Sequence, residues 1–213
     1  MMISHRKKFV FFHCEKTGGS AISVALAPYC EHVKNLPTDL PIDEYLEYMQ
    51  KRKVGHWGRS KRLEYPYKEH HSMSLYDFPK DYYTFSFVRN PFTRLASAFI
   101  GNTRNKDYKD ICELIERRHE LLEGKPWEGP SSGGNLEPQS KMLDRPIKYV
   151  AKYENFLEEW NFIARGLGID NTIHTVNKVK NYDYKQLYNQ RSIDKVVREY
   201  KEDFERFGYS TKL

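Results

Sequence analysis

Two short apolar runs, each followed by a loop and then by a helical pattern, constrain the fold of this chain more than any other feature. The first run is residues 9–13, and a Gly-containing turn separates it from the helix-like residues 20–27. The second run, residues 82–88, leads through Arg89-Asn90-Pro91 into another helix, whose first turn Pro91 suits. This repeated order of strand, loop and helix predicts parallel strands with helices packed against them.

The second half of the chain continues this alternation. Residues 147–153 predict a third strand, and the next helix has an apolar face made by Phe156, Trp160, Ile163, Ala164 and Leu167. Gly168 is suited to end that helix as its C-cap. A final helix is predicted by apolar residues spaced three and four apart from Ile193 to Phe207, before Gly208. We therefore expect one domain, residues 1–213, with an α/β fold in three layers and a mainly parallel central sheet flanked by helices.

The first loop has the residues expected of an anion site. Its sequence is His13-Cys14-Glu15-Lys16-Thr17-Gly18-Gly19-Ser20. Glycines let backbone N–H groups approach an anion, the helix N-terminus adds partial positive charge, and Lys16, Thr17 and Ser20 add donors. A Walker A loop has its lysine directly after the second glycine, whereas Lys16 precedes both glycines. The loop is thus a phosphate cradle of another kind, and the alternative is an ordinary turn with a solvated lysine.

The second loop can face the same ligand. Arg89 stands at the carboxyl end of the strand over residues 82–88, and Ser97 is about two turns into the next helix. In open α/β sheets, ligands bind beyond the carboxyl ends of strands, so both loops can contact one nucleotide. The net charge of +6 suits an anionic ligand. Lys and Arg are spread among 29 acidic residues and form no concentrated basic arm, so nucleic acid is not the expected partner.

Cysteine spacing and hydropathy exclude several other classes of protein. Cys14, Cys30 and Cys112 are odd in number and widely spaced, so we expect neither a disulfide framework nor a zinc site, and no other metal site. The apolar run of residues 9–12 is too short for a signal sequence or a membrane span. We expect a cytoplasmic protein with no membrane span, although a trimmed catalytic domain of an anchored protein would look similar.

These motifs resemble those of the sulfotransferases that use 3'-phosphoadenosine 5'-phosphosulfate (PAPS) as donor. The branch concerned contains heparan sulfate 2-O-sulfotransferase and small bacterial carbohydrate sulfotransferases. Residues 16–20 resemble the family's loop for the 5'-phosphosulfate, and residues 87–97 resemble its motif for the 3'-phosphate. The likeness continues through residues 136–140, 153–156 and 200–209. Cys14 and Glu15 depart from the pattern, since they replace a small residue and a proline.

The resemblance implies a P-loop-like fold and an enzyme of the EC 2.8.2 class. Such an enzyme moves a sulfuryl group in line from PAPS to a hydroxyl group and releases adenosine 3',5'-bisphosphate, with no metal. The family match implies donor binding by Lys16, Thr17, Gly18, Gly19, Ser20, Arg89 and Ser97. Lys16 would also stabilise charge on the departing nucleotide, as cations do in phosphoryl transfer.

A histidine is the candidate base for the acceptor hydroxyl, because its pKa suits proton transfer near neutral pH. This branch of the family carries its candidate catalytic histidine just before the second strand, where this chain has His70 and His71. We favour His71, with His70 as the alternative. The resemblance favours a carbohydrate acceptor, and Gln139, Lys178 and Lys180 are weaker candidates for ligand contacts.

Two other functions fit parts of the same pattern. A P-loop kinase would present a phosphate loop at the same place, but the displaced lysine argues against it, as does the lack of a clear strand ending in a magnesium-binding aspartate. A non-catalytic module could bind acidic glycans through the positive charge alone. A strong response to adenosine 3',5'-bisphosphate would favour the sulfotransferase over both.

Overall fold

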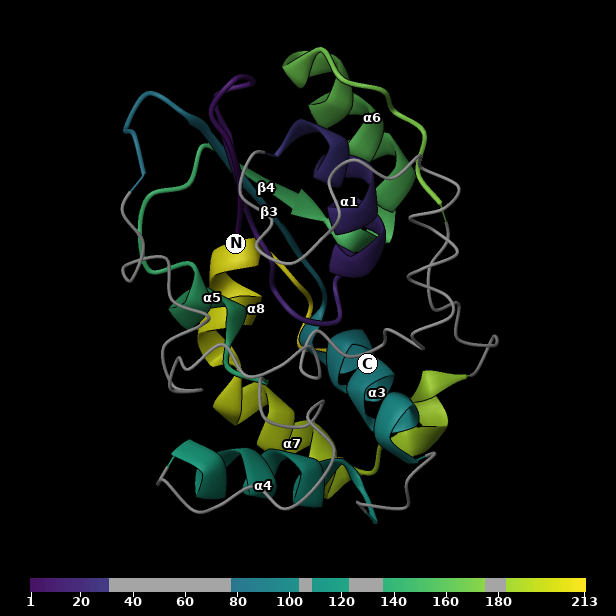
Figure 1. Cartoon of the computed structure of the whole chain (residues 1–213). Coiled ribbons are helices and arrows are strands. Elements are labelled where there is room, and N and C mark those ends of the chain that lie inside the picture. The colour runs from purple at the N-terminus through teal and green to yellow at the C-terminus, as the bar shows by residue number, and fades with distance from the viewer. Residues whose placement is uncertain (31–77, 104–108, 123–135, 175–182) are drawn as a thin grey trace.

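We describe the fold from a computed structural model, which describes residues 1–30, 78–103, 109–122, 136–174 and 183–213 (Figure 1). The elements, with η for short 3-10 helices, are β1 (Met2–Ser4), β2 (Phe9–Phe12), α1 (Gly19–Leu26), η1 (Ala27–Tyr29), β3 (Tyr83–Val88), α3 (Pro91–Thr103), α4 (Ile111–Leu122), α5 (Gln139–Met142), β4 (Tyr149–Lys152), η3 (Tyr153–Asn155), α6 (Phe156–Leu167), η4 (Tyr184–Leu187), α7 (Gln190–Glu199) and α8 (Lys201–Phe207).

The described strands form one sheet in the order β1-β2-β3-β4. β2 pairs with β3 and β3 pairs with β4 in parallel, with Phe12 opposite Ser86 and Val88 opposite Lys152. The mainly parallel sheet predicted from the sequence is confirmed. β1 is an additional strand that runs antiparallel to β2. Its three residues are too few for a periodic pattern, so the sequence does not predict it.

Helices cover both faces of the sheet because its central strands are apolar on both sides. Phe9, Phe11, Phe85 and Phe87 pack against residues of α1 and α6. Val10, Phe12 and Val88 pack on the opposite face against residues of α5 and α8. Figure 1 shows α1 and α6 on one side of the strands and α5 and α8 on the other. The predicted three-layer α/β fold is therefore confirmed.

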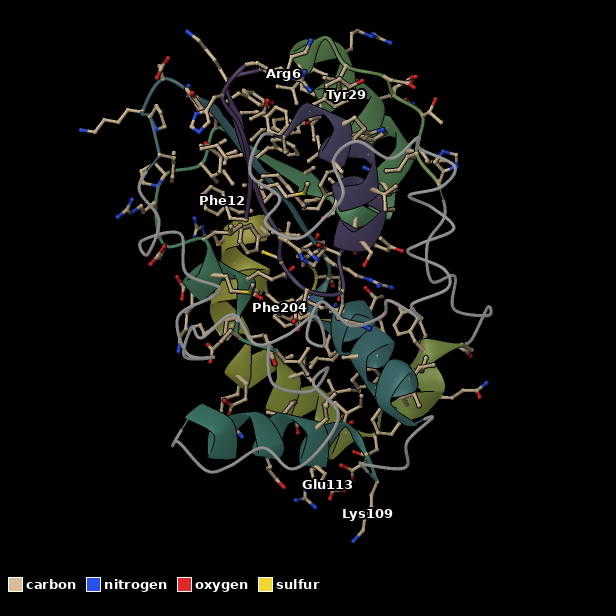
Figure 2. The ribbon with its side chains drawn as sticks, viewed as in Figure 1. Arg6, Phe12, Tyr29, Lys109, Glu113 and Phe204 are labelled. Carbon is tan, nitrogen blue, oxygen red and sulfur yellow. The ribbon has the colours of Figure 1, made fainter. Side chains whose placement is uncertain are left out.

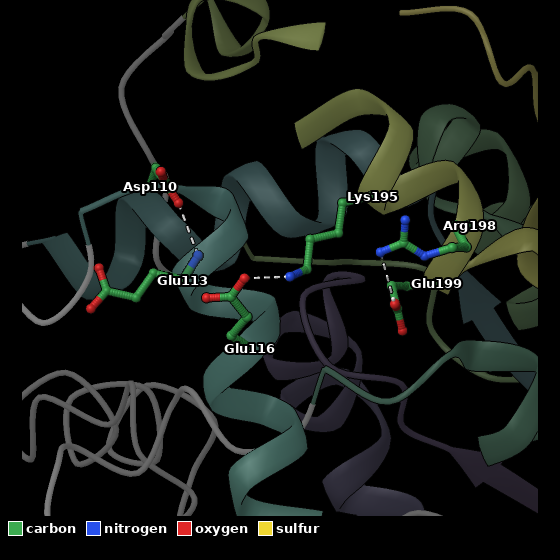
Figure 3. A network of polar contacts seen from close by, with 6 residues as sticks. All are labelled: Asp110, Glu113, Glu116, Lys195, Arg198 and Glu199. Carbon is green, nitrogen blue, oxygen red and sulfur yellow. Dashed lines mark hydrogen bonds and ion pairs between the residues drawn. The ribbon is translucent and has the colours of Figure 1, made fainter. Parts of the chain in front are cut away.

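A second apolar core lies among helices α3, α4, α7 and α8. Phe92, Ile111, Val196 and Phe204 are buried there together. Figure 2 shows Phe204 inside the molecule and the side chains of Lys109 and Glu113 at its outer edge. An ion pair between Lys195 Nζ and Glu116 Oε1, 2.5 Å apart, joins α7 to α4 at the surface (Figure 3). α3, the helix that follows the loop after β3, is packed in this core through Phe92.

The prediction of one final helix over residues 193–207 is wrong, because α7 and α8 are separate helices. Tyr200 lies between them with φ −115° and ψ 23°, and its hydroxyl donates to the Leu136 carbonyl over 2.7 Å. Apolar residues continue at spacings of three and four across this break because both helices pack toward the interior. The spacing therefore could not reveal the break.

Two glycines end helices at the positions that the sequence predicted. Gly168 and Gly208 have left-handed backbone, with φ of 59° and 64°, at the ends of α6 and α8, which confirms Gly168 as a C-cap. Cys14, Cys30 and Cys112 are buried, and none of them forms a disulfide within the described part of the chain. Among the helices of the described ranges, none combines the length and hydropathy needed to cross a membrane.

Candidate anion-binding site

Three loops meet at the carboxyl edge of the parallel strands and form the candidate site. They are residues 13–18 after β2, residues 89–90 after β3, and η3 after β4. Nη1 of Arg89 donates a hydrogen bond to the Lys16 carbonyl over 3.1 Å, which joins the first two loops. The Arg89 guanidinium also lies 4.3 Å from the centre of the Tyr153 ring. The two loops predicted to face one ligand therefore touch, and a third loop completes the group.

The β2–α1 loop has a tight backbone that includes two left-handed residues. Lys16 has a φ of 66° and Gly18 a φ of 81°. A positive φ is uncommon for lysine, and such backbone strain is concentrated at functional sites. Gly18 is also the N-cap of α1, and its carbonyl accepts hydrogen bonds from the N–H groups of Ala21 and Ile22. The loop thus leads directly into a helix N-terminus, where partial positive charge favours an anion.

Gly18 and Gly19 are required at their positions because other side chains lie against them. A Cβ built on Gly18 would be 2.6 Å from Cε2 of Phe156 and 3.1 Å from Cε2 of Tyr153. A Cβ on Gly19 would overlap the ring of His13. The loop is therefore packed against the segment after β4 as well as against its own first residue.

The side chains predicted to donate to an anion have different surroundings. Thr17 is fully buried, and its hydroxyl donates to the Cys14 carbonyl over 2.6 Å. The Thr17 hydroxyl therefore donates its hydrogen within the loop, whereas the sequence suggested that it would donate to a ligand. Ser20 is half-buried in the first turn of α1.

The pKa of Lys16 is lowered, chiefly because burial disfavours its charged form. The positive charges of Arg89 and Arg94 lower it further, and the Glu15 carboxylate acts in the opposite direction. A negative charge brought to this place would favour the protonated lysine. Lys16 is therefore a partly desolvated cation beside two arginines, and an anion would offset this positive charge.

The orientation of Arg89 is fixed by both neighbouring loops and by α3. Its Nε donates to Thr93 Oγ1 over 3.0 Å, in the first turn of that helix. Ser97 is half-buried and follows Thr93 by four residues, so it lies one turn further along the same helical face. Arg89 and Ser97, which the resemblance assigns to one phosphate, are thus on the same side of α3.

Arg94 holds the backbone beside the candidate site, a role that the sequence alone does not reveal. It is almost fully buried, its Nε donates to the Glu15 carbonyl over 3.0 Å, and its Nη1 donates to the Glu137 carbonyl over 2.8 Å. The sequence places Arg94 on α3 but does not tell which way its side chain points. An arginine in the first turn of a helix that follows a candidate ligand loop is the sequence signal that could have found it.

Cys14 belongs to the core of the loop. Its side chain is 1% exposed, and its Sγ is 3.5 Å from Ser86 Oγ. Burial raises the pKa of the Cys14 thiol to about 11, so the thiol stays protonated near neutral pH. Cys14 is therefore a packing residue.

Of the remaining candidate residues, four lie outside the described ranges and one lies inside them. His70, His71, Lys178 and Lys180 lie outside the described residues. Gln139 is fully buried and contacts the backbone of Arg89. Within the described ranges, no group of three or more His, Cys, Asp and Glu side chains is arranged to hold a metal ion.

Comparisons with known proteins identify a family for this chain and a solved structure with a similar fold. The model of the sulfotransferase family matches residues 1–210. The crystal structure of a sulfotransferase from Alicyclobacillus acidocaldarius is similar with a TM-score of 0.51, over 95% of this chain and 96% of that chain. The two sequences are 13% identical, so this likeness concerns the fold. No curated protein matches the chain.

Replacing Gly18 by alanine tests the packing of the β2–α1 loop. We expect Gly18→Ala to lower the free energy of unfolding by about 1–2 kcal/mol from the left-handed backbone alone, with a further loss from the contact with Phe156. Urea unfolding followed by circular dichroism measures the change. Gly166→Ala is the matched control, since no atom lies within 4 Å of its added Cβ and alanine favours the helix by up to about 1 kcal/mol. Equal stability of Gly18→Ala and the wild type would contradict the described loop.

Proposed function

Because the chain belongs to the sulfotransferase family, we propose that it transfers a sulfuryl group from PAPS to a hydroxyl group of a carbohydrate. The observation that carries the proposal is the hydrogen bond of 3.1 Å between Arg89 and the Lys16 carbonyl. It joins the two loops whose sequences resemble the family's 5'-phosphosulfate and 3'-phosphate motifs. A nucleotide with negative groups at both ends of its ribose suits two linked cationic loops.

Each end of the donor has its own binding residues in this proposal. The 5'-phosphosulfate binds residues 16–20, where Lys16, the loop N–H groups and the N-terminus of α1 supply positive charge. The 3'-phosphate binds Arg89 and Ser97, because the planar guanidinium can donate two parallel hydrogen bonds to phosphate oxygens. The stacking of Arg89 on Tyr153 supports this role, since it limits the directions that the guanidinium can take.

The proposed reaction is a direct displacement at sulfur. The acceptor oxygen forms a bond to sulfur while the bond between sulfur and the bridging phosphate oxygen breaks. The acceptor proton passes to His71, or to His70 as the alternative, and Lys16 stabilises the negative charge on the bridging oxygen. The roles of the histidines rest on the family resemblance, and the carbohydrate acceptor rests on it as well. The residues named supply the charge and the base, so the proposal needs no metal ion.

We also propose that residues 1–213 work as one catalytic domain. Contacts from the residues after α8 to the site loops support this, since the Tyr209 hydroxyl donates to Glu154 Oε2 over 2.9 Å and Glu154 Oε1 accepts from the Asn90 N–H over 2.9 Å. The C-terminal segment therefore takes part in holding the loop after β3.

Calorimetric titration with adenosine 3',5'-bisphosphate tests the donor site. We expect the wild type to bind it more tightly than AMP, and Arg89→Ala to weaken this binding at least about tenfold, because hydrogen bonds to a charged phosphate are lost. AMP affinity should fall less than that of the bisphosphate, since AMP has no 3'-phosphate and loses only the support that Arg89 gives to the Lys16 carbonyl.

The matched control is Arg198→Ala, which removes a guanidinium that is 68% exposed on α7. Its affinity for the bisphosphate should equal that of the wild type. Wild-type binding of ATP with magnesium in preference to the bisphosphate would overturn the proposed donor and restore the kinase interpretation.

The lowered pKa of Lys16 predicts the alkaline limit of the reaction. Only protonated Lys16 stabilises the leaving oxygen, so kcat/KM for PAPS should fall as pH rises through a pKa below the ordinary lysine value of 10.5. Lys16→Arg keeps the positive charge to a higher pH and should shift this fall upward. Release of adenosine 3',5'-bisphosphate measures the rate, with a carbohydrate acceptor that supports wild-type turnover. If kcat/KM fell at the same pH in the wild type and in Lys16→Arg, a group other than Lys16 would be responsible for the fall.

Substitution of His71 tests the proposed base. We expect His71→Ala to lower kcat by about 10²–10⁴, because that is the usual contribution of a positioned base, while the affinity for adenosine 3',5'-bisphosphate stays near wild type. His70→Ala is the matched control and should keep most of the turnover. The reverse result would make His70 the base, and normal turnover in both variants would exclude the pair.

A further inference from the structure

The backbone of Arg89 is held by the buried side chain of Gln139. Oε1 of Gln139 accepts from the Arg89 N–H over 2.9 Å, and Nε2 donates to the Arg89 carbonyl over 2.8 Å. Arg89 follows the last residue of β3, so its peptide groups are where the strand pairing ends. One side-chain amide satisfies both of them.

A buried carboxylate of α8 in turn fixes Gln139. Asp203 is fully buried, and its Oδ2 accepts from the backbone N–H of Gln139 over 2.8 Å and from Nε2 over 3.2 Å. Oδ1 accepts from the Ser140 N–H over 2.7 Å. A carboxylate only accepts hydrogen bonds, so the NH2 group of Gln139 has to face Asp203 and its Oε1 has to face the Arg89 N–H. Asp203 therefore sets the orientation of the amide.

This arrangement gives Gln139 a role other than acceptor binding. Its side chain is 0% exposed, and its polar atoms are taken up by Arg89 and Asp203. The guanidinium of Arg89 is oriented separately by Thr93, Tyr153 and the Lys16 carbonyl. The backbone and the guanidinium of Arg89 are thus held by different residues, and Gln139 holds the backbone.

We propose that Gln139, oriented by Asp203, is a positioning residue that fixes the Arg89 backbone so that the guanidinium meets the 3'-phosphate of the nucleotide. This inference rests on the proposed function, because the assignment of Arg89 to the 3'-phosphate does so. It connects the C-terminal helix α8 with nucleotide recognition through one buried chain of hydrogen bonds. A positioning residue of this kind affects only the part of the ligand that Arg89 contacts.

Gln139→Met tests this selectivity, because methionine keeps the length of the side chain and removes its hydrogen bonds. We expect the affinity for adenosine 3',5'-bisphosphate to fall about tenfold and that for AMP to change by less than about twofold, both measured by calorimetry. In an Arg89→Ala background, Gln139→Met should cause no further loss, since it acts through Arg89.

Ser140→Ala is the matched control at the next buried residue. In the described part of the chain, Ser140 Oγ is buried with no hydrogen-bond partner, and the substitution leaves the backbone N–H that binds Asp203 in place. It should keep both nucleotide affinities. A Ser140→Ala protein with the same selective loss as Gln139→Met would overturn the inference, because the loss would then follow from any change in this part of the core.

Gln139→Glu provides a second test if Gln139→Met does not fold. The introduced carboxyl group would lie beside that of Asp203, which raises the pKa of the introduced group, and its protonated form regains a donor. We expect the preference for the bisphosphate over AMP, relative to wild type at the same pH, to recover as pH falls. A preference that does not depend on pH in this variant would overturn the inference.

The outcomes separate this inference from the proposed function. A wild type without preference for the bisphosphate over AMP would overturn the donor assignment and the inference with it. A wild-type preference that Gln139→Met retains would overturn the inference alone. Equal losses for both nucleotides, or a further loss in the Arg89→Ala background, would assign Gln139 a general structural role and overturn it as well.

Discussion

Parallel hydrogen bonding between β2, β3 and β4 brings three strand ends to the same edge of one sheet, and the candidate site depends on this pairing. Lys16, Arg89 and Tyr153 are far apart in sequence, yet each follows a strand within a few residues. In an antiparallel sheet, neighbouring strand ends would alternate between two edges, and these residues would be separated. The hydrogen bond and the ring contact of Arg89 are therefore consequences of strand direction.

Positive charge gathered at this edge has an electrostatic cost that an anion would offset. Burial and the nearby arginines lower the pKa of Lys16, and burial also lowers the pKa of Arg89. Arginine remains protonated in proteins, so the guanidinium groups keep their charge. Lys16 is therefore the group whose protonation depends on the nearby positive charge. A ligand with several negative charges would stabilise protonated Lys16 and, by binding only the folded chain, the fold itself.

The sequence predicted the parts of the fold and site that depend on local patterns. The strand around Phe11, the loop with Lys16 and the cap at Gly168 follow from apolar runs, glycines and helix periodicity, and the structure agrees with them. The sequence did not predict the contacts between segments that are far apart in the chain. The break at Tyr200 lies within an uninterrupted apolar spacing, and the direction of Arg94 depends on packing that no single helix determines.

Hydrogen bonds also hold the β2–α1 loop in place of the proline that this chain lacks there. Cys14 and Glu15 stand where the family has a small residue and a proline, and a proline would restrict the backbone locally. The structure instead holds both carbonyls, since Thr17 donates to that of Cys14 and Arg94 donates to that of Glu15. Arg94 comes from α3 and also binds the Glu137 carbonyl before α5. Rigidity that a proline would supply locally is thus supplied by a distant helix, which makes the β2–α1 loop dependent on the helices around it.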